Sequence, residues 1–124
     1  MAGSAPNVFP FMRFADADAA LAWLSEAFGF EPREVYRDDQ DRIAHAEVSL
    51  GPGIVMFGPG DPASHGVYVA VQDVDAHYKQ AKAAGAEITR EIEDTHYGSR
   101  EYTARDPEGH VWSFGSYLPQ AGNW

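Results

Sequence analysis

The sequence contains no cysteine, which excludes disulfides, thiolate metal sites and cysteine nucleophiles. Positive charge is scarce, because 9 Lys and Arg residues stand against 19 Asp and Glu residues, for a formal net charge of −10. A nucleic-acid-binding surface requires a basic footprint, so we expect no nucleic-acid partner. No apolar run approaches the length of a membrane-spanning helix, and we expect no membrane association.

A secretion signal is also missing from the first residues, Met1 to Pro6, which lack a basic stretch followed by an apolar one. We therefore expect a soluble cytoplasmic protein. With 124 residues, of which 44% are hydrophobic and 23% charged, the chain has the length and composition of a single globular domain, 1–124. Its acidic balance favours solubility and would help to attract a cationic ligand.

The two halves of the chain resemble each other. An Asp-x-Asp-Ala motif follows an apolar strand in both halves, at Asp16–Ala19 after 8–14 and at Asp73–Ala76 after 66–71. Asp caps free N–H groups at a helix start, so we predict helices at about 18–28 and 75–84. The first helix carries an apolar stripe with i, i+3, i+7 spacing, and a glycine ends each helix. That stripe comprises Leu21, Leu24 and Phe28.

Three further strands are predicted after each helix, from alternating patterns bounded by Gly, Pro and Asp turns. They span residues 33–37, 43–50 and 54–57 in the first half, and 88–92, 100–105 and 111–114 in the second. The order βαβββ therefore occurs twice, in an α+β fold. The module boundaries are 8–58 and 66–118, joined by a linker at 59–65.

Three stretches, DADAALAWLSEAFGF, HAEVSLGPGIVMF and REYTARDPEGHVWSFGSY, resemble the vicinal oxygen chelate superfamily, which includes glyoxalases, bleomycin-resistance proteins and extradiol dioxygenases. The resemblance extends from about Val8 to Leu118 and is closest to the small glyoxalase-like and bleomycin-resistance-like members. It implies that the two modules curl their sheets around a cleft, with the helices outside. It also implies a homodimer.

Strand alternation sorts the residues that would face such a cleft. In the strand 43–50, Ala46 and Val48 should pack under the helix, which leaves His45 and Glu47 on the other face. The same argument gives the candidate ligand-binding residues: Phe9, Phe11, Arg13, His45, Glu47, Met56, Tyr68 and Ser113. The loop 96–100 is a candidate lid that adds Tyr97 and Arg100.

Metal chemistry is not expected at the place where the resemblance implies it. Enzymes of the superfamily bind one divalent metal through His and Glu or Gln on the first and last strands of each module. The matching positions are Phe9 or Pro10, Met56, Gly66 and Ser113, the last of which stands seven residues after Asp106, where the enzymes usually carry Glu. None has the usual metal-binding side chain, so we predict no metal and no cofactor.

Our leading hypothesis is a metal-free protein that sequesters or carries a small aromatic compound, as a bleomycin-resistance-like protein would, with Glu47 drawing in a positive charge. The alternative is a metal-dependent lyase, isomerase or dioxygenase, in which His45, Glu47 and either His65 or His110 would converge. A third hypothesis is an accessory domain that binds another protein. Without a defined third ligand, two residues such as His45 and Glu47 more often form a simple hydrogen-bonded pair.

Overall fold

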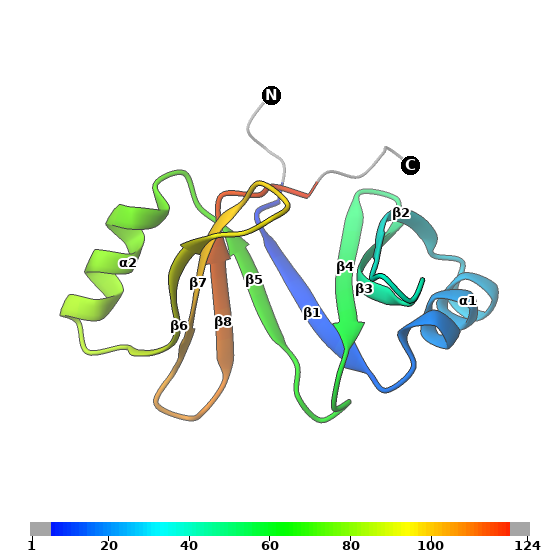
Figure 1. The fold of residues 1–124 in the computed structure, drawn as a ribbon, viewed down its shortest axis with the longest axis horizontal. Coiled ribbons are helices and arrows are strands. Elements are labelled where there is room, and N and C mark those ends of the chain that lie inside the picture. Colours follow the sequence, from blue (N-terminus) through cyan, green and yellow to red (C-terminus); the bar gives the residue numbers. More distant parts are fainter. Residues whose placement is uncertain (1–5, 120–124) are drawn as a thin grey trace. The chain divides into compact units, whose positions relative to one another are not determined.

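The computed structural model describes residues 6–119, so the first five residues of the Met1–Pro6 stretch considered above lie outside the described part. The chain forms two compact units, one made of residues 9–65 and the other of residues 6–8 and 66–119. Each unit combines one helix with four strands (Figure 1), which confirms the α+β class and the repeated βαβββ order. Within residues 6–119, no helix is both long and apolar enough to cross a membrane.

The first unit orders its strands β2-β3-β4-β1, with β1 parallel to β4 and the other neighbours antiparallel. Its elements are β1 (Val8–Phe14), α1 (Ala17–Phe28), β2 (Glu31–Arg37), β3 (Ile43–Leu50) and β4 (Gly53–Pro59).

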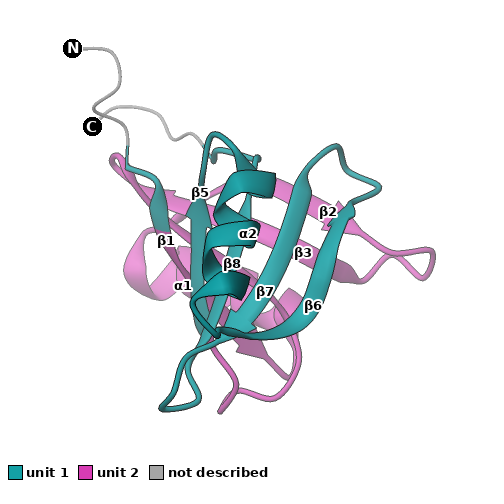
Figure 2. Cartoon of the chain, turned by 90° about the vertical axis from the view of Figure 1, so that its left-hand side faces the viewer, with its two compact units in different colours: residues 1–8, 66–119 teal, residues 9–65, 120–124 magenta. Residues whose placement is uncertain are grey.

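The second unit repeats this arrangement in the order β5-β8-β7-β6, with β5 parallel to β8. Its elements are β5 (Gly66–Ala70), α2 (Val74–Ala83), β6 (Glu87–Asp94), β7 (Arg100–Arg105) and β8 (Val111–Gly115). Figure 2 shows α2 lying across one face of the strands of its own unit.

Both helices begin as the aspartate motif predicts. The side chain of Asp16 accepts a hydrogen bond from Ala19 N, and that of Asp73 accepts one from Ala76 N, each over 3.0 Å. At the other end of α1, Gly29 adopts the left-handed conformation (φ 78°) that closes a helix with the least steric cost. Local capping chemistry therefore sets where these helices start and stop.

Each helix packs its apolar side against one face of its sheet. In the first unit, Ala46, Val48 and Phe57 are buried against Leu21 and Leu24 of α1. In the second unit, the corresponding core includes Tyr102 and Ala104, with Tyr78 of α2 and Phe114 of β8 packed against it.

The predicted stripe on α1 is wrong at its last member. Phe28 is 57% exposed and makes an edge-to-face contact with the exposed Trp23, at 4.7 Å between ring centroids. Residues Leu21 and Leu24 remain in the stripe. The final turn of α1 thus carries its aromatic side chain away from the core.

The turn between β7 and β8 is organised by the carboxylate of Asp106. Its Oδ1 accepts hydrogen bonds from the backbone N–H groups of Glu108 (3.0 Å) and His110 (2.9 Å), and its Oδ2 accepts one from Trp112 Nε1 (3.1 Å). The His110 N–H bond is the largest cause of a pKa lowered to about 2 for Asp106, from an ordinary value of 3.8. The ionised form of Asp106 therefore stabilises the fold.

We expect Asp106→Asn to lower the free energy of unfolding at neutral pH, because the amide accepts these hydrogen bonds more weakly than the carboxylate. Since the pKa is lowered in the folded state, this stabilisation is present above pH 3.8 and is lost as the pH falls through about 2. Urea unfolding measured between pH 7 and pH 2 should show the two proteins converging in acid. Asp39→Asn, at an exposed position in another turn, controls for the loss of one charge; equal curves for both variants would contradict the assignment.

Candidate functional site

The strands of each unit carry the candidate site residues on the face that the helix of that unit does not cover, which we call the helix-free face of the unit. In β3, Ala46 and Val48 belong to the core under α1, so the alternating His45 and Glu47 point to the opposite face. The predicted alternation therefore holds from His45 to Val48, whereas at the start of β3 Ile43 packs in the core because the β2–β3 register shifts there.

Three rings lie in a row across the helix-free face of the first unit, and we call them the aromatic strip: Tyr36 of β2, His45 of β3 and Phe11 of β1. The centroids of His45 and Phe11 are 6.0 Å apart with 30° between the ring planes. Those of His45 and Tyr36 are 5.9 Å apart at 40°. The sequence analysis identified Phe11 and His45 but missed Tyr36, which is the direct partner of His45 in the β2–β3 register.

A glycine keeps the aromatic strip continuous. Strand β4 runs between β3 and β1, and its residue Gly58 lies beneath the Phe11 ring. A Cβ atom placed on Gly58 would lie 3.8 Å from Phe11 Cζ and 3.1 Å from the carbonyl oxygen of Ala44. A longer side chain there would therefore occupy the space that the Phe11 ring now fills.

Glu47 lies next to the aromatic strip and is fully buried. Its Oε2 is 3.5 Å from His45 Nε2. Across the sheet, Met56 pairs in register with both Glu47 and Phe11 and is also buried. Burial, a hydrogen bond to Glu34 and the negative charges of Glu34 and Glu47 raise the pKa of Tyr36. The environment of the strip at β2 is accordingly acidic.

The opposite end of the aromatic strip is basic. The guanidinium carbon of Arg13 lies 4.9 Å from the centroid of the Phe11 ring, in cation–π geometry. Phe9, on the same strand, is fully buried, so it does not present an open wall to a ligand in this structure. The first unit thus brings together Phe11, Arg13, His45, Glu47 and Met56 from the sequence-predicted set.

The helix-free face of the second unit carries a hydrogen-bonded polar network in place of rings. Arg90 of β6 donates to Glu101 (3.1 Å) and to Thr103 (3.2 Å) of β7, and Thr103 Oγ1 lies 3.1 Å from Ser113 Oγ of β8. Tyr97 donates to the same Glu101 carboxylate over 2.9 Å. Arg90 and Glu101 were missed by the sequence analysis. Alternation with the core residue Tyr102 could have indicated Glu101, whereas Arg90 shares its parity with the core-packed Ile88 and is placed by the irregular β6–β7 register.

Two tyrosines of the second unit, Tyr97 and Tyr68, have raised pKa values. Burial, followed by the negative charge of Glu101 and a hydrogen bond to it, raises the pKa of Tyr97 to about 12. Burial and the charge of Glu101 also raise the pKa of Tyr68, whose hydroxyl donates to the carbonyl oxygen of Tyr117. Both hydroxyls therefore stay protonated at neutral pH and act as hydrogen-bond donors.

The predicted lid loop is held closely by its own hydrogen bonds. Ser99 N donates to Thr95 Oγ1 (3.0 Å), and Thr95 N donates back to the carbonyl oxygen of Ser99. Arg100 does not join the other candidate residues. It lies on the helix side of β7, where its guanidinium pairs with Asp75 of α2 (3.0 Å) and with Asp94 (3.1 Å).

The side chains at the four positions where the resemblance implies metal ligands cannot coordinate a divalent metal in the usual way. Phe9, Pro10, Met56 and Gly66 offer no side-chain ligand of the usual kind, and Ser113 bonds to Thr103. Within residues 6–119, no group of three or more His, Asp and Glu side chains is gathered closely enough to hold a metal ion. We therefore derive no chemical step through a metal.

Solved structures of other proteins share this fold. A superfamily member from Vibrio splendidus is 18% identical, with a TM-score of 0.70 over 87% of this chain and 96% of that chain. Methylmalonyl-CoA epimerase from Streptomyces coelicolor, in complex with 2-nitronate-propionyl-CoA, is 17% identical, with a TM-score of 0.68 over 90% of this chain and 97% of that chain. At these identities, the likeness concerns the fold alone.

TioX from a Micromonospora species has a higher sequence identity of 35%, over 87% of this chain and 95% of that chain, with a TM-score of 0.43. The sequence profile of the Glyoxalase/Bleomycin resistance protein/Dioxygenase superfamily matches residues 10–114. This match covers both βαβββ units and agrees with the resemblance noted in the sequence. The chain belongs to the glyoxalase/bleomycin resistance protein/dioxygenase superfamily.

Proposed function

We propose that this protein binds a flat, positively charged aromatic compound without a metal or other cofactor, and so sequesters or carries it. The observation that carries the proposal is the aromatic strip of Tyr36, His45 and Phe11 next to the buried carboxylate of Glu47. Apolar walls with a few convergent polar groups are the ordinary composition of a small-molecule site.

The dimensions of the strip suit a ligand with several fused rings. Its ring centroids are spaced by 6.0 and 5.9 Å, so the strip extends over three neighbouring π-faces from β1 to β2. Tyr36 is 43% exposed, and the His45 side chain is 27% exposed, which leaves surface for stacking. Aromatic pairs add about 0.5–1.5 kcal/mol beyond the area they bury.

The charges at the two ends would orient the ligand. Glu34 accepts a hydrogen bond from the Tyr36 hydroxyl (3.1 Å), and Glu47 lies near the same ring, whereas Arg13 occupies the face of Phe11. A cationic group would therefore lie at the Tyr36 end, near both carboxylates and away from the guanidinium. The overall charge of −10 would also speed the encounter with a cation.

We expect Tyr36→Leu to weaken the binding of proflavine, a planar aromatic cation, by about three- to tenfold, because one stacking face is lost. Glu47→Gln should weaken proflavine binding by about fivefold or more through the loss of a nearby negative charge, yet leave the binding of neutral acridone unchanged. Fluorescence titration measures both affinities. Tyr36 is a surface residue, so its variant should fold normally.

Glu26→Gln, at an exposed position of α1, changes the net charge by the same amount and serves as the matched control. Equal proflavine affinities for Glu47→Gln and Glu26→Gln would show that only the overall charge matters. If neither Tyr36→Leu nor Glu47→Gln changed the affinity, the aromatic strip would not be the binding site.

Protein purified without chelators should contain far less than one equivalent of Fe, Mn, Ni or Zn, because the implied ligand positions carry unsuitable side chains. Inductively coupled plasma mass spectrometry gives the stoichiometry. A full equivalent of one metal, lost in Glu47→Gln, would contradict this expectation. It would favour instead a metal-dependent lyase, isomerase or dioxygenase built on the His45–Glu47 pair.

We also propose that the protein forms a homodimer. The support is the exposed Trp23–Phe28 pair on α1, since clustered exposed aromatics often mark an interaction surface. Sedimentation velocity over a dilution series should show a species of twice the 13.6 kDa chain mass. Trp23→Ala should shift this equilibrium toward the monomer. A monomer at all concentrations would contradict the proposal.

A further inference from the structure

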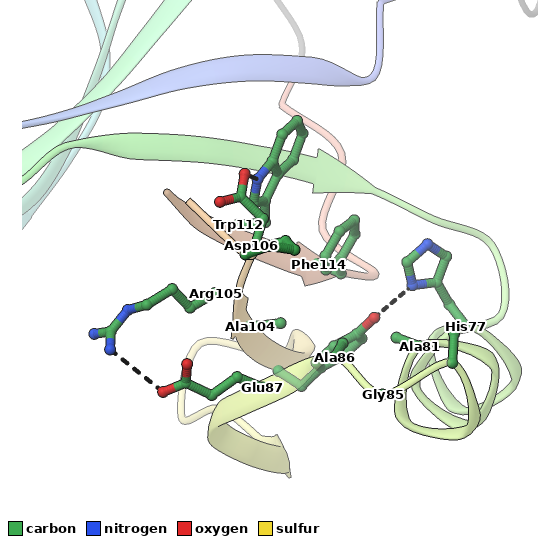
Figure 3. Close-up of a pocket in the computed structure, with 13 residues that line it drawn as sticks. His77, Ala81, Gly85, Ala86, Glu87, Ala104, Arg105, Asp106, Trp112 and Phe114 are labelled. Carbon is green, nitrogen blue, oxygen red and sulfur yellow. Dashed lines mark hydrogen bonds and ion pairs between the residues drawn. The ribbon is translucent and has the colours of Figure 1, made fainter. Parts of the chain in front are cut away.

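A pocket of about 630 Å³ lies within the second unit, on the side that carries α2 and not on its helix-free face. It is located between the C-terminal half of α2, the start of β6, and strands β7 and β8 (Figure 3). The pocket is therefore separate from the aromatic strip, which belongs to the first unit. A volume of this size is in the range of ligand-binding cavities.

Rings and methyl groups make up most of the pocket lining. Tyr102 and Phe114 stack with centroids 5.1 Å apart and 23° between their planes, and the His77 ring lies 4.3 Å from that of Phe114. Small side chains from α2, from the loop that follows it and from β7 supply the remaining space (Figure 3). These are Ala81 of α2, Ala86 of the loop and Ala104 of β7.

The polar groups around the pocket are already engaged with one another. His77 Nδ1 is 2.6 Å from the Tyr102 hydroxyl, and Trp112 Nε1 donates to Asp106. At the rim, Arg105 forms an ion pair with Glu87 over 3.3 Å. A charged ligand would lose its hydration here without gaining a dedicated counter-ion, which is costly. The lining therefore favours a neutral molecule.

The first unit carries larger side chains at the positions equivalent to the alanines of the pocket. Ala81 stands eight residues after the helix cap Asp73, and Leu24 stands eight residues after Asp16. Ala104 and Val48 occupy the same register positions, two residues beyond Tyr102 and Ala46. In the first unit, Leu24 and Val48 are part of a packed core.

Ala86 also corresponds to a larger residue of the first unit. Ala86 comes directly after Gly85, as Phe30 comes directly after Gly29, and Phe30 packs against the core of the first unit. The second unit thus distributes its bulk differently: it has alanine at these three positions, but Tyr102 and Trp112 where the first unit has Ala46 and Val55. The rings of the second unit are therefore gathered on one side of the layer and the alanine methyls on the other, and the pocket lies between them, open to the surface.

We propose that this pocket is a second binding site, which takes a neutral, mostly hydrocarbon molecule carrying at least one aromatic ring. The molecule would lie on the three alanine methyl groups and against the partly exposed His77 and Trp112 rings, because Tyr102 is fully buried beneath them. The site is independent of the aromatic strip, so the two sites bind different ligands.

The test uses N-phenyl-1-naphthylamine, a neutral aromatic dye that fluoresces in apolar surroundings. The wild-type chain should bind it saturably with one equivalent per chain. Ala81→Leu and Ala104→Val, made separately, introduce the residues that the first unit already uses. Each should weaken the binding of the dye at least tenfold, while the melting temperature stays equal or rises because the added carbons bury apolar surface of the pocket.

Ala83→Leu, at an exposed position of α2, is the matched control and should bind the dye as the wild type does. Tyr36→Leu should also leave dye binding unchanged, which distinguishes this site from the aromatic strip. In protein labelled with ¹³C at the alanine methyls, the dye should shift the signals of Ala81, Ala86 and Ala104. No saturable binding, unshifted signals from these methyls, or unchanged affinity in both filled variants would overturn the proposal.

Discussion

The packing of a single helix across one face of four strands determines the surroundings of every strand side chain in each unit. Because successive residues of a strand point to opposite faces, Ala46 meets α1 while His45 lies on the other face. The same alternation separates Tyr102, beside α2, from Glu101. A register slip of one residue would exchange core and functional side chains, so the core fixes the functional face.

The two units share a backbone plan but differ in chemistry. Where Met56 pairs with Glu47 in the first unit, Ser113 pairs with Thr103 in the second. One helix-free face therefore presents rings and an acidic group, and the other presents a hydrogen-bonded network centred on Arg90. The two units therefore have the same backbone arrangement, and the side chains at equivalent positions determine the chemistry of each helix-free face.

Local patterns predicted much of the fold, because helix capping, turns and strand alternation depend on neighbours in the sequence. They failed at Phe28, since periodicity does not show how far a helix extends beyond its sheet. Arg90 and Glu101 come together only through pairing between β6 and β7, whose register is irregular. Arg100 shares its parity with Tyr102, so strict alternation would already have placed it beside the helix.

The aromatic strip depends on the lack of a side chain at Gly58. Glycine weakens a strand because it loses more conformational freedom on folding than other residues. Here its bare backbone lets a ring from β1 extend over β4 toward a ring from β3. Almost any substitution would stiffen the strand and at the same time divide the surface into two separate halves. Gly58 thus determines how wide the aromatic strip is, and hence how large a molecule it accommodates, although Gly58 has no side chain with which to contact a ligand.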